Sequence, residues 1–523
     1  TFDSGTGSEI VIGDIVAANG TMVLRNGSTV TNSGSAYIGA TSGKTGSASV
    51  VGSTWNNATG LFLGAQNATT NGGVGSLSVA SGGRIQIGDD TFDSGTGSEI
   101  VIGDTVAANG TMVVRNGSTV TNSGSTYIGA TSGKTGSASV EGSTWNNATG
   151  LFLGAQNATT NGGVGSLSVA SGGRIQIGDD TFDSGTGSEM VIGDTSAANG
   201  TLVLRNSSSV TNAGSSYIGA TSGKTGSAVV SGSTWTSGTG LFLGGPNATT
   251  NGGVGSLSVS NGGRVQIGND TGSSGIVVGD SVAANGTLVV RNGSTITNTG
   301  SASIGASSGR TGSAIVTGTG SQWTNSGELR VGISGNGSLS VEAGGLASSA
   351  FSYVGLSPGS TGSITVSGAG SQWNTSDGAF VGYAGSGTLN LQNGGAARMG
   401  VGFIGYDGLG TGVVNVTGAG SKLTTTSTNG AGLFVGYYGS GTVNISDGGR
   451  VQVGNDTFSS GTAAQMVIGD NNQSIGTMFV YRGTVNNSGS AYLGATSGKI
   501  GRVDVGGANS VWNNATGLYL GAQ

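Results

Sequence analysis

The segment AYIGATSGKTGSASVVGSTWNNATGLFLG, residues 36–64, contains one complete period of the pattern that decides the fold. An aliphatic residue followed by glycine ends the short segment AYIG, and the same feature returns 25 residues later in LFLG. Between them lie GSASV, which fits the signature G-[ST]-x-x-[VL], and a third segment, STWNN. Three short strands separated by turns of Gly, Ser and Asn are typical of one coil of a parallel β-solenoid.

The aliphatic–glycine feature recurs along the whole chain. Nineteen such glycines occur from Gly13 to Gly521, and most intervals are 23–27 residues, with 39 where a longer insertion is present. No stretch keeps a 3.6-residue apolar period with helix caps, and the strands follow one another too closely for crossover helices. We therefore predict an all-β fold: a right-handed parallel β-helix (β-solenoid) of about 19 coils of 23–27 residues, with three short strands per coil.

Longer repeats are built from these coils. Residues 1–90, 91–180 and 181–270 are near-identical units, and the first two differ at only four positions. Residues 271–456 keep the pattern with shorter spacings, and 457–523 restart the long unit and stop within it. We expect one continuous solenoid over 1–523, whose near-identical units arose by duplication. Because the last unit stops in mid-repeat, we expect the sequence to be a piece of a longer chain.

Composition excludes several classes of function. The 523 residues include 111 glycines and 2 prolines, and there is no cysteine and no histidine. Disulfides, thiolate nucleophiles, zinc sites and histidine acid–base chemistry are therefore excluded. With 18 basic against 24 acidic residues and no basic cluster in the sequence, we expect no nucleic-acid partner. No apolar run reaches 18 residues, so any membrane anchor is expected outside these residues.

Alternation assigns the core. In SASVV, Val50 points inward and Val51 outward, and Glu141 replaces Val51 in the next repeat. Ile38 of AYIG is assigned to the core, whereas Tyr37 either packs against an outer loop or joins an exposed aromatic ladder. All six tryptophans lie in the third segment, where other coils carry aliphatic residues, so we assign them to the core; the alternative, an exposed sugar-stacking platform, stays open. They are Trp55, Trp145, Trp235, Trp323, Trp373 and Trp512.

Several segments carry a recognisable family pattern. They are GSGTLNLQNGG (385–395), GTGVVNVTGAGSKL (410–423) and GSGTVNISDGG (439–449). These segments resemble the Gly-rich β-helix repeat of bacterial autotransporter passenger domains. The resemblance implies a right-handed parallel β-helix displayed outside Gram-negative cells, often as an adhesin. The translocator barrel that accompanies such passengers is not represented in these segments and is expected outside residues 1–523.

Repeated carboxylates are candidates for catalytic or metal-binding groups. Asp89 and Asp90 recur as Asp179 and Asp180, within GDDTFDSGTGSE. A catalytic pair normally occurs once rather than with every repeat, so we expect no enzyme activity. Calcium is a further candidate at these four aspartates, because carboxylates and loop carbonyls suit a hard cation; otherwise we expect no cofactor.

Arginines recur in the context GGR[IV]Q[IV]G. A row of arginines suits phosphate or an anionic glycan. The alternative is one exposed charge per repeat that discourages edge-to-edge aggregation. The arginines in this context are Arg84, Arg174, Arg264 and Arg450.

These observations lead us to expect a non-catalytic extracellular protein of a bacterial cell surface. It would act as a stalk or adhesin, by binding through repeated side faces or by presenting a distal module. Its expected partners are glycans or proteins of host or neighbouring cells, or further copies of itself. The alternatives are a self-assembling extracellular filament or matrix protein and a polysaccharide-degrading β-helix enzyme.

Overall fold

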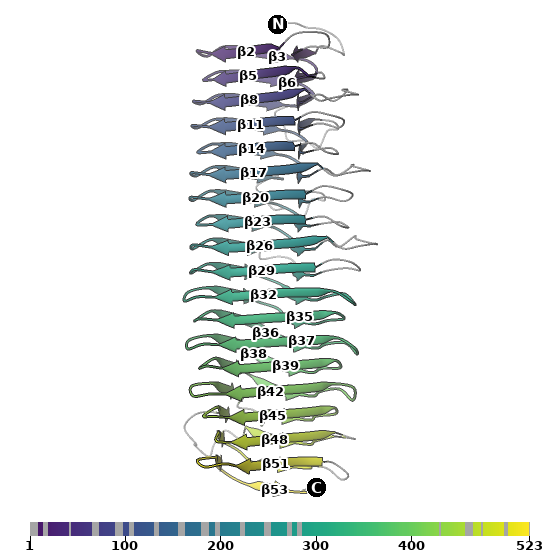
Figure 1. Cartoon of the computed structure of the whole chain (residues 1–523), viewed down its shortest axis with the longest axis vertical. Helices are drawn as coiled ribbons and strands as arrows, with labels where there is room; N and C mark the ends of the chain where they lie inside the picture. Colours follow the sequence, from purple (N-terminus) through teal and green to yellow (C-terminus); the bar gives the residue numbers. More distant parts are fainter. Residues whose placement is uncertain are drawn as a thin grey trace. The chain divides into compact units, whose positions relative to one another are not determined.

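The computed structural model is built from β-strands, and the residues that it describes contain no helix (Figure 1). Those residues are 9–13, 19–40, 43–64, 73–88, 98–103, 109–129, 135–154, 163–178, 188–193, 199–219, 225–244, 253–268, 275–279, 285–427, 430–454, 464–471, 474–495 and 500–521. The chain forms two compact units. Unit 1 comprises Thr1–Ser274 and Ala283–Asn285, and unit 2 comprises Gly275–Val282 and Gly286–Gln523.

One coil of unit 1 shows how three faces arise. The seven-residue strand β5 (Thr45–Val51) forms the first face, β6 (Thr54–Asn57) the second and β7 (Gly60–Leu63) the third. Two residues separate β5 from β6, and two separate β6 from β7. Each strand pairs in parallel with the equivalent strand of the next coil, as β5 does with β8. Residues in register on successive coils therefore form rows that run across the strands.

The first-face strands number nine in each unit among the described residues. In unit 1 they are β2 (Gly20–Arg25), β5, β8 (Val74–Ala80), β11 (Asn109–Arg115), β14 (Thr135–Glu141), β17 (Val164–Ala170), β20 (Asn199–Arg205), β23 (Thr225–Ser231) and β26 (Val254–Ser260). In unit 2 they are β29 (Asn285–Arg291, all but its first residue), β32 (Thr311–Thr317), β35 (Asn336–Glu342), β37 (Thr361–Ser367), β39 (Ser386–Gln392), β42 (Thr411–Thr417), β45 (Ser440–Ser446), β48 (Ile475–Tyr481) and β51 (Ile500–Gly506).

The second-face strands are mostly four residues long. In unit 1 they are β3 (Thr29–Asn32), β6, β9 (Arg84–Ile87), β12 (Thr119–Asn122), β15 (Thr144–Asn147), β18 (Arg174–Ile177), β21 (Ser209–Asn212), β24 (Thr234–Ser237) and β27 (Arg264–Ile267). In unit 2 they are β30 (Thr295–Asn298), β33 (Gln322–Asn325), β40 (Ala396–Met399), β43 (Lys422–Thr425), β46 (Arg450–Val453), β49 (Thr484–Asn487) and β52 (Val511–Asn514), while β36 (Leu346–Val354) and β38 (Gln372–Val381) run through both the second and third faces.

The third-face strands carry the aliphatic–glycine signature. In unit 1 they are β1 (Ile10–Ile12), β4 (Ala36–Ile38), β7, β10 (Glu99–Ile102), β13 (Ser125–Ile128), β16 (Gly150–Leu153), β19 (Glu189–Ile192), β22 (Ser215–Ile218) and β25 (Gly240–Leu243). In unit 2 they are β28 (Gly275–Val278), β31 (Ser301–Ile304), β34 (Leu329–Val331), β41 (Val401–Ile404), β44 (Ala431–Val435), β47 (Gln465–Ile468), β50 (Ala491–Leu493) and β53 (Leu518–Leu520), together with the ends of β36 and β38.

This arrangement confirms the predicted fold class, an all-β parallel solenoid with three short strands per coil. The predicted number of coils was slightly too high. Each of the nineteen signature glycines follows a third-face strand, but only eighteen first-face strands lie between them in the described residues. Nineteen glycines enclose only eighteen intervals, so the number of glycines exceeds the number of complete coils by one.

Alternation along the first face separates core from surface. Ala48 and Val50 of β5 are buried, whereas Ser49 and Val51 between and after them are partly exposed. Glu141, the counterpart of Val51 in β14, is exposed. The charged replacement therefore leaves the core unchanged, which avoids the large cost of burying an unpaired carboxylate.

Two glycines explain why the coil needs its sequence signatures. Gly39, after β4, has φ +71°, and a Cβ there would lie 2.4 Å from the Val74 carbonyl oxygen. Gly46, in β5, faces Gly39 so closely that its Cβ would lie 2.2 Å from the Gly39 nitrogen. The corner between the third and first faces closes only because both residues lack a side chain.

The core of each coil is filled from all three faces. Ile38, Val50 and Trp55 are each 0% exposed. Trp55 lies in register between Val30 and Ile85, and Trp373 lies between Ala347 and Ala397. Aliphatic or small neighbours thus leave room for each ring. The other fully buried indoles are Trp145, Trp235 and Trp323.

Trp512 lies in β52, the last second-face strand that the structure describes. This residue is only partly buried. Its strand pairs with β49 and with no further strand among the described residues. The following coil, which supplies Ile85 beside Trp55, is not described for Trp512, so its assignment to the core stays a prediction.

Candidate functional site

The carboxylates predicted as calcium candidates lie outside the described residues. These are Asp89, Asp90, Asp179 and Asp180. Within the described ranges, no three Asp or Glu side chains gather in a group able to hold a metal ion. The same ranges contain no helix of the length and hydropathy needed to cross a membrane.

The buried indoles do not form a ligand platform. The Nε1 atoms of Trp55, Trp145, Trp235, Trp323 and Trp373 are buried and have no hydrogen-bond partner among the described residues. A sugar-stacking surface needs exposed ring faces, and these five rings have none. The tryptophans therefore act in packing.

The third face of unit 1 carries outward aromatic pairs instead. Tyr37 stacks on Phe62 of the next coil, with ring centroids 5.0 Å apart and planes 12° apart. The Phe62 ring lies over Gly60 of its own strand, where a Cβ would come within 2.6 Å of the ring. Tyr37 and Phe62 therefore form a stacked row, as in the ladder alternative, but the row is not an exposed one: Tyr37 is half-buried and Phe62 is 7% exposed. The repeats form the same pairs: Tyr127–Phe152 and Tyr217–Phe242.

Unit 2 carries a larger group of stacked aromatic side chains, here called the aromatic cluster. Three consecutive coils carry the sequence F-[VI]-G-Y at residues 380–383, 403–406 and 434–437. In each, the phenylalanine faces outward from the third face and the tyrosine follows the signature glycine. The cluster consists of Tyr353, Phe380, Tyr383, Phe403, Tyr406, Phe434, Tyr437 and Tyr438.

The cluster is organised as two columns of rings set nearly at right angles. Phe380 stacks on Phe403 with centroids 5.0 Å apart, and Phe403 stacks on Phe434 at the same distance. Tyr406 stacks on the tyrosines of the neighbouring coils and presents its ring edge-on to Phe380, with centroids 4.9 Å apart and an interplanar angle of 88°. Edge-to-face and offset-stacked contacts each add roughly 0.5–1.5 kcal/mol beyond burial of the rings.

Burial changes the acidity of the tyrosine hydroxyls. It raises the pKa of Tyr353, Tyr406 and Tyr437 above the ordinary value, with neighbouring tyrosines and carboxylates as secondary causes. The hydroxyls are therefore protonated at neutral pH and available as hydrogen-bond donors. Burial also raises the pKa of Asp470, whose backbone N–H donates to the Gly436 carbonyl, one coil from Tyr437.

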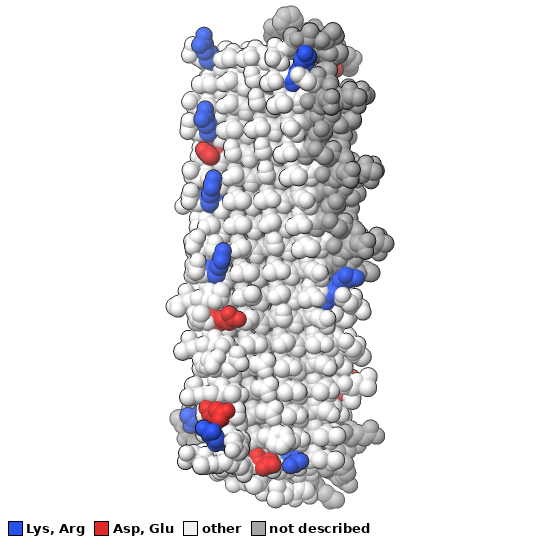
Figure 2. All heavy atoms as spheres, in the orientation of Figure 1, with Lys and Arg blue, Asp and Glu red and all other residues white. Residues whose placement is uncertain are grey.

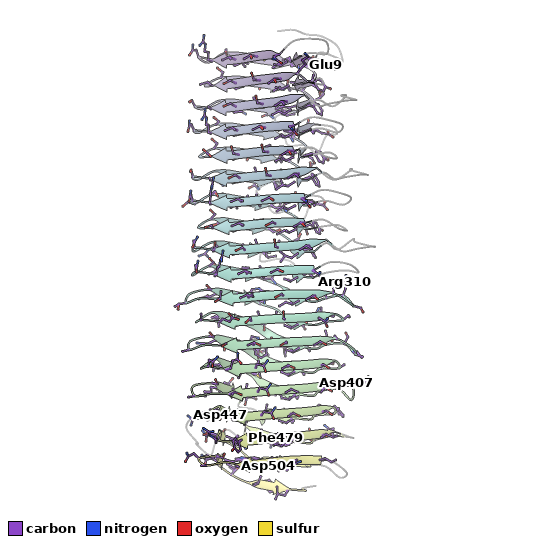
Figure 3. All side chains as sticks on the ribbon, in the orientation of Figure 1. Glu9, Arg310, Asp407, Asp447, Phe479 and Asp504 are labelled. Atoms are coloured by element: carbon purple, nitrogen blue, oxygen red, sulfur yellow. The ribbon has the colours of Figure 1, made fainter. Side chains whose placement is uncertain are left out.

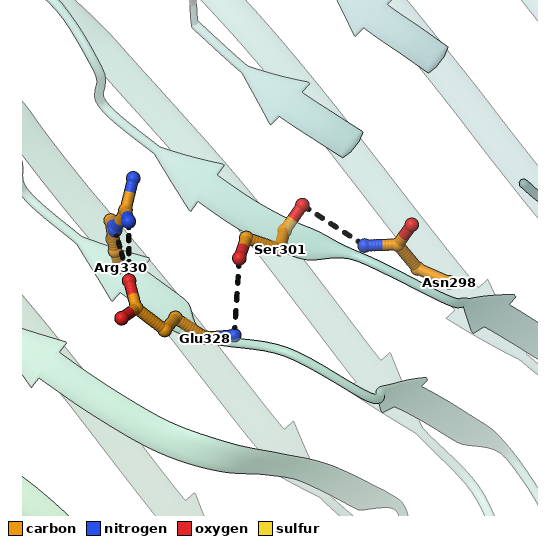
Figure 4. Close-up of polar contacts among 4 residues, drawn as sticks. All are labelled: Asn298, Ser301, Glu328 and Arg330. Atoms are coloured by element: carbon orange, nitrogen blue, oxygen red, sulfur yellow. Dashed lines mark hydrogen bonds and ion pairs between the residues drawn. The ribbon is translucent and has the colours of Figure 1, made fainter. Parts of the chain in front are cut away.

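A charged pair lies next to the cluster on the same face. Arg330 Nε donates to Glu328 Oε2 at 2.7 Å, and the two side chains form an ion pair (Figure 4). The Glu328 N–H donates to Ser301 Oγ at 3.2 Å, which fixes the start of this strand. Arg330 is in register with Tyr353, so the position that carries an aromatic side chain in β36 carries a charged side chain in β34.

The geometry determines which groups of the cluster a partner can reach. Stacked rings cover one another's faces, so ring edges and tyrosine hydroxyls form the accessible surface. Tyr438 is 42% exposed, and Leu409, in the loop that follows Tyr406, is 72% exposed. Apolar edges beside hydroxyl donors suit an amphipathic partner such as a glycan or a protein surface.

Asp407 lies in the same loop as Leu409. Asp447, which follows the first-face strand β45, lies on the opposite side of the unit in the view of Figure 3.

Polar rows occupy the first face of unit 2. Asn415 Nδ2 donates to Asn390 Oδ1 at 2.8 Å, and Asn444 Nδ2 donates to Asn415 Oδ1 at 2.8 Å. The asparagine side chains on successive coils are therefore hydrogen-bonded to one another and remain partly exposed. Such a repeated surface offers many equivalent weak contacts rather than one pocket.

Comparison with known proteins gives no family. No family profile matches the sequence, and no curated protein matches it. Among solved structures, one match is a hyper-glycosylated fragment of TibA, glycosylated by TibC. It shares 14% sequence identity, covers 93% of this chain and 100% of that one, and has a TM-score of 0.26. A likeness this weak carries no argument, so the fold alone defines the class: a parallel β-solenoid protein.

The aromatic cluster is the feature that sequence reasoning missed. Its signal was present, because F-[VI]-G-Y occurs in three successive coils and in no coil of unit 1. Alternation shows only that Phe380 and Phe403 point outward. Recognising a cluster requires the register, which places the two rings on adjacent coils.

Proposed function

We propose that this chain is a non-catalytic extracellular protein of a bacterial cell surface, acting as an adhesin that binds through repeated side faces and as a stalk that holds a distal module away from the cell. The single observation that carries the proposal is the repetition of the outward surface. The row Thr21, Ser47, Ser76 and its continuation in β11 and β14 presents hydroxyls on successive coils at one position of the first face.

Repetition favours adhesion because weak contacts add up along a stack of coils. Many equivalent contacts raise avidity by 10²–10⁴ without any strong single site. The aromatic cluster adds partly exposed rings, which are enriched at binding surfaces. Catalysis, by contrast, needs a unique constellation of groups, and none of the features described above is of that kind.

The location is tested first. Intact cells that express the complete gene are labelled with an antibody against residues 285–427 and compared with permeabilised cells. We expect equal labelling of both, and loss of the label after external protease treatment. Labelling only after permeabilisation would reject an extracellular role.

Adhesion is tested separately with the purified chain. Beads coated with it are counted on layers of epithelial cells and of bacteria, against beads coated with an unrelated β-solenoid protein. We expect retention well above the control on at least one layer. A variant with Tyr383, Tyr406 and Tyr437 changed to Ser tests the aromatic cluster, and Tyr37→Ser with Tyr127→Ser tests the unit 1 ladder. Retention no greater than the control on either layer would reject the adhesin.

A further inference from the structure

In six of the nine coils of unit 1 that the structure describes, an exposed arginine borders the turn between the first-face and the second-face strand. Some are the last residues of first-face strands, such as Arg25 and Arg115, and others are the first residues of second-face strands, such as Arg84. All of them are exposed. We call these residues the arginine edge: Arg25, Arg84, Arg115, Arg174, Arg205 and Arg264.

The turn between the two kinds of strand keeps these arginines on one edge. In the coil of β11, Asn116 and Gly117 both have positive φ, 59° and 71°, which makes a tight turn. Turns of successive coils also bond to one another, since the Gly82 N–H donates to the Asn116 carbonyl at 3.1 Å. Arg84 and Arg115 therefore border adjacent turns, and such a pair recurs every third coil, or about 14 Å at the usual strand spacing.

The edge concentrates positive charge that the chain as a whole lacks. The net charge of the chain is −6. On the edge, one carboxylate is described, that of Glu141, which lies in register with Arg115. None of the six arginines forms an ion pair with the residues that the structure describes. Figure 2 shows basic side chains at intervals along the ends of the first-face strands, with one acidic side chain among them.

We propose that the arginine edge of unit 1 binds a linear anionic polysaccharide through its carboxylate or sulfate groups. A guanidinium forms paired, charge-assisted hydrogen bonds with such planar or multi-oxygen anions. Six separated arginines suit a polymer with regularly spaced charges, because each exposed contact is weak and their number supplies the avidity. No aromatic side chain belongs to this edge, so the base stacking that single-stranded nucleic acids use is missing.

This inference deepens the proposed adhesive function, because it names a ligand class, and it rests on that function for its biological meaning. Its test uses purified protein. A failure to bind would therefore leave the surface location and the bead adhesion to be judged by their own experiments.

The experiment measures binding of the full chain to immobilised heparin, polygalacturonate, neutral dextran and single-stranded DNA, at low and high salt. Heparin and polygalacturonate distinguish sulfate from carboxylate as the recognised group. The edge variant changes Arg115, Arg174 and Arg205 to Gln. The matched control changes Lys44, Arg398 and Arg502 to Gln, which removes the same charge from other places. Circular dichroism verifies that both variants are folded.

We expect binding to at least one anionic polysaccharide, none to dextran, and weakening as salt rises. The edge variant weakens binding about tenfold, which equals about 1.4 kcal/mol, or about 0.5 kcal/mol for each of the three exposed contacts, whereas the control changes binding less than twofold. Glu141→Val, which installs the residue found at Val51, tightens binding. Equal losses in the edge and control variants, or no binding to either polysaccharide, would overturn the proposal. Tighter binding to DNA would replace the polysaccharide with a nucleic acid.

Discussion

Replacing Trp55 by alanine tests whether the indoles hold the coils together. The ring is 0% exposed and lies between Val30 and Ile85. Truncating a buried tryptophan to alanine costs about 3–5 kcal/mol in lost burial and cavity formation. The indole N–H has no partner among the described residues, and an unpaired buried donor already costs about 1–3 kcal/mol in the folded state. We therefore expect Trp55→Ala to lower the free energy of unfolding by about 3 kcal/mol, the lower end of the range.

Two further variants separate the contributions of packing and of the unpaired donor. Trp55→Phe keeps most of the ring and removes the N–H, so it lowers the free energy of unfolding much less than Trp55→Ala. Trp512→Ala removes a partly buried ring whose N–H already donates to Asn514 Oδ1 at 3.1 Å. We expect its effect to be less than half that of Trp55→Ala.

Urea unfolding followed by far-UV circular dichroism measures the three variants. Repeat arrays can unfold in segments, so amide hydrogen exchange of peptides covering β6 and its neighbours provides a local readout. A loss near zero for Trp55→Ala would refute the packing account. So would equal losses for Trp55→Ala and Trp512→Ala, because burial would then not determine the cost.

Two other perturbations follow from the same geometry. Gly39→Ala should destabilise the chain by several kcal/mol, because the added Cβ would collide with the Val74 carbonyl oxygen. Gly27 has a similar φ but no atom within 4 Å of an added Cβ, so Gly27→Ala should cost only about 1 kcal/mol, as at other left-handed positions. Equal losses of stability for the two variants in thermal or urea unfolding would contradict the close approach at Gly39. The raised pKa values of Tyr353, Tyr406 and Tyr437 contribute stability to the folded state below the unfolded pKa of 10.0, and this contribution is lost as pH rises through the folded pKa. The urea concentration at the unfolding midpoint should therefore fall above about pH 10, and it should fall less when the three tyrosines are changed to Phe. An equal fall in the Phe variant would refute this explanation.

The coil could be predicted from the sequence because its constraints recur at regular intervals along the chain. Gly39 and Gly46 sit where backbone approaches backbone, and no other residue fits, so their spacing reveals the coil. Alternation likewise placed Val50 inward and Glu141 outward. The spacings are visible in the sequence, although the contact that excludes a side chain at Gly39 is with Val74 of the next coil.

Features that depend on neighbouring coils were harder to predict. The assignment of Trp512 to the core stays a prediction, because its burial depends on a strand next to β52 that the structure does not describe. The aromatic cluster was missed because the contact of Phe380 with Phe403 is a property of register, and the interval between the two residues is not fixed by either coil alone. The calcium candidates at Asp89 and Asp179 remain predictions.

Deletion of one long repeat is the most direct test of the claim that binding is distributed over equivalent coils. Deleting residues 91–180 joins Asp90 to Thr181 and recreates the junction sequence found between Asp180 and Thr181. The measurement is the retention of beads coated with this variant on the cell layer that retains the intact chain. We predict a folded variant, by circular dichroism, whose retention is reduced but not abolished. Complete loss of retention with the fold intact, or retention equal to that of the intact chain, would contradict binding through repeated side faces.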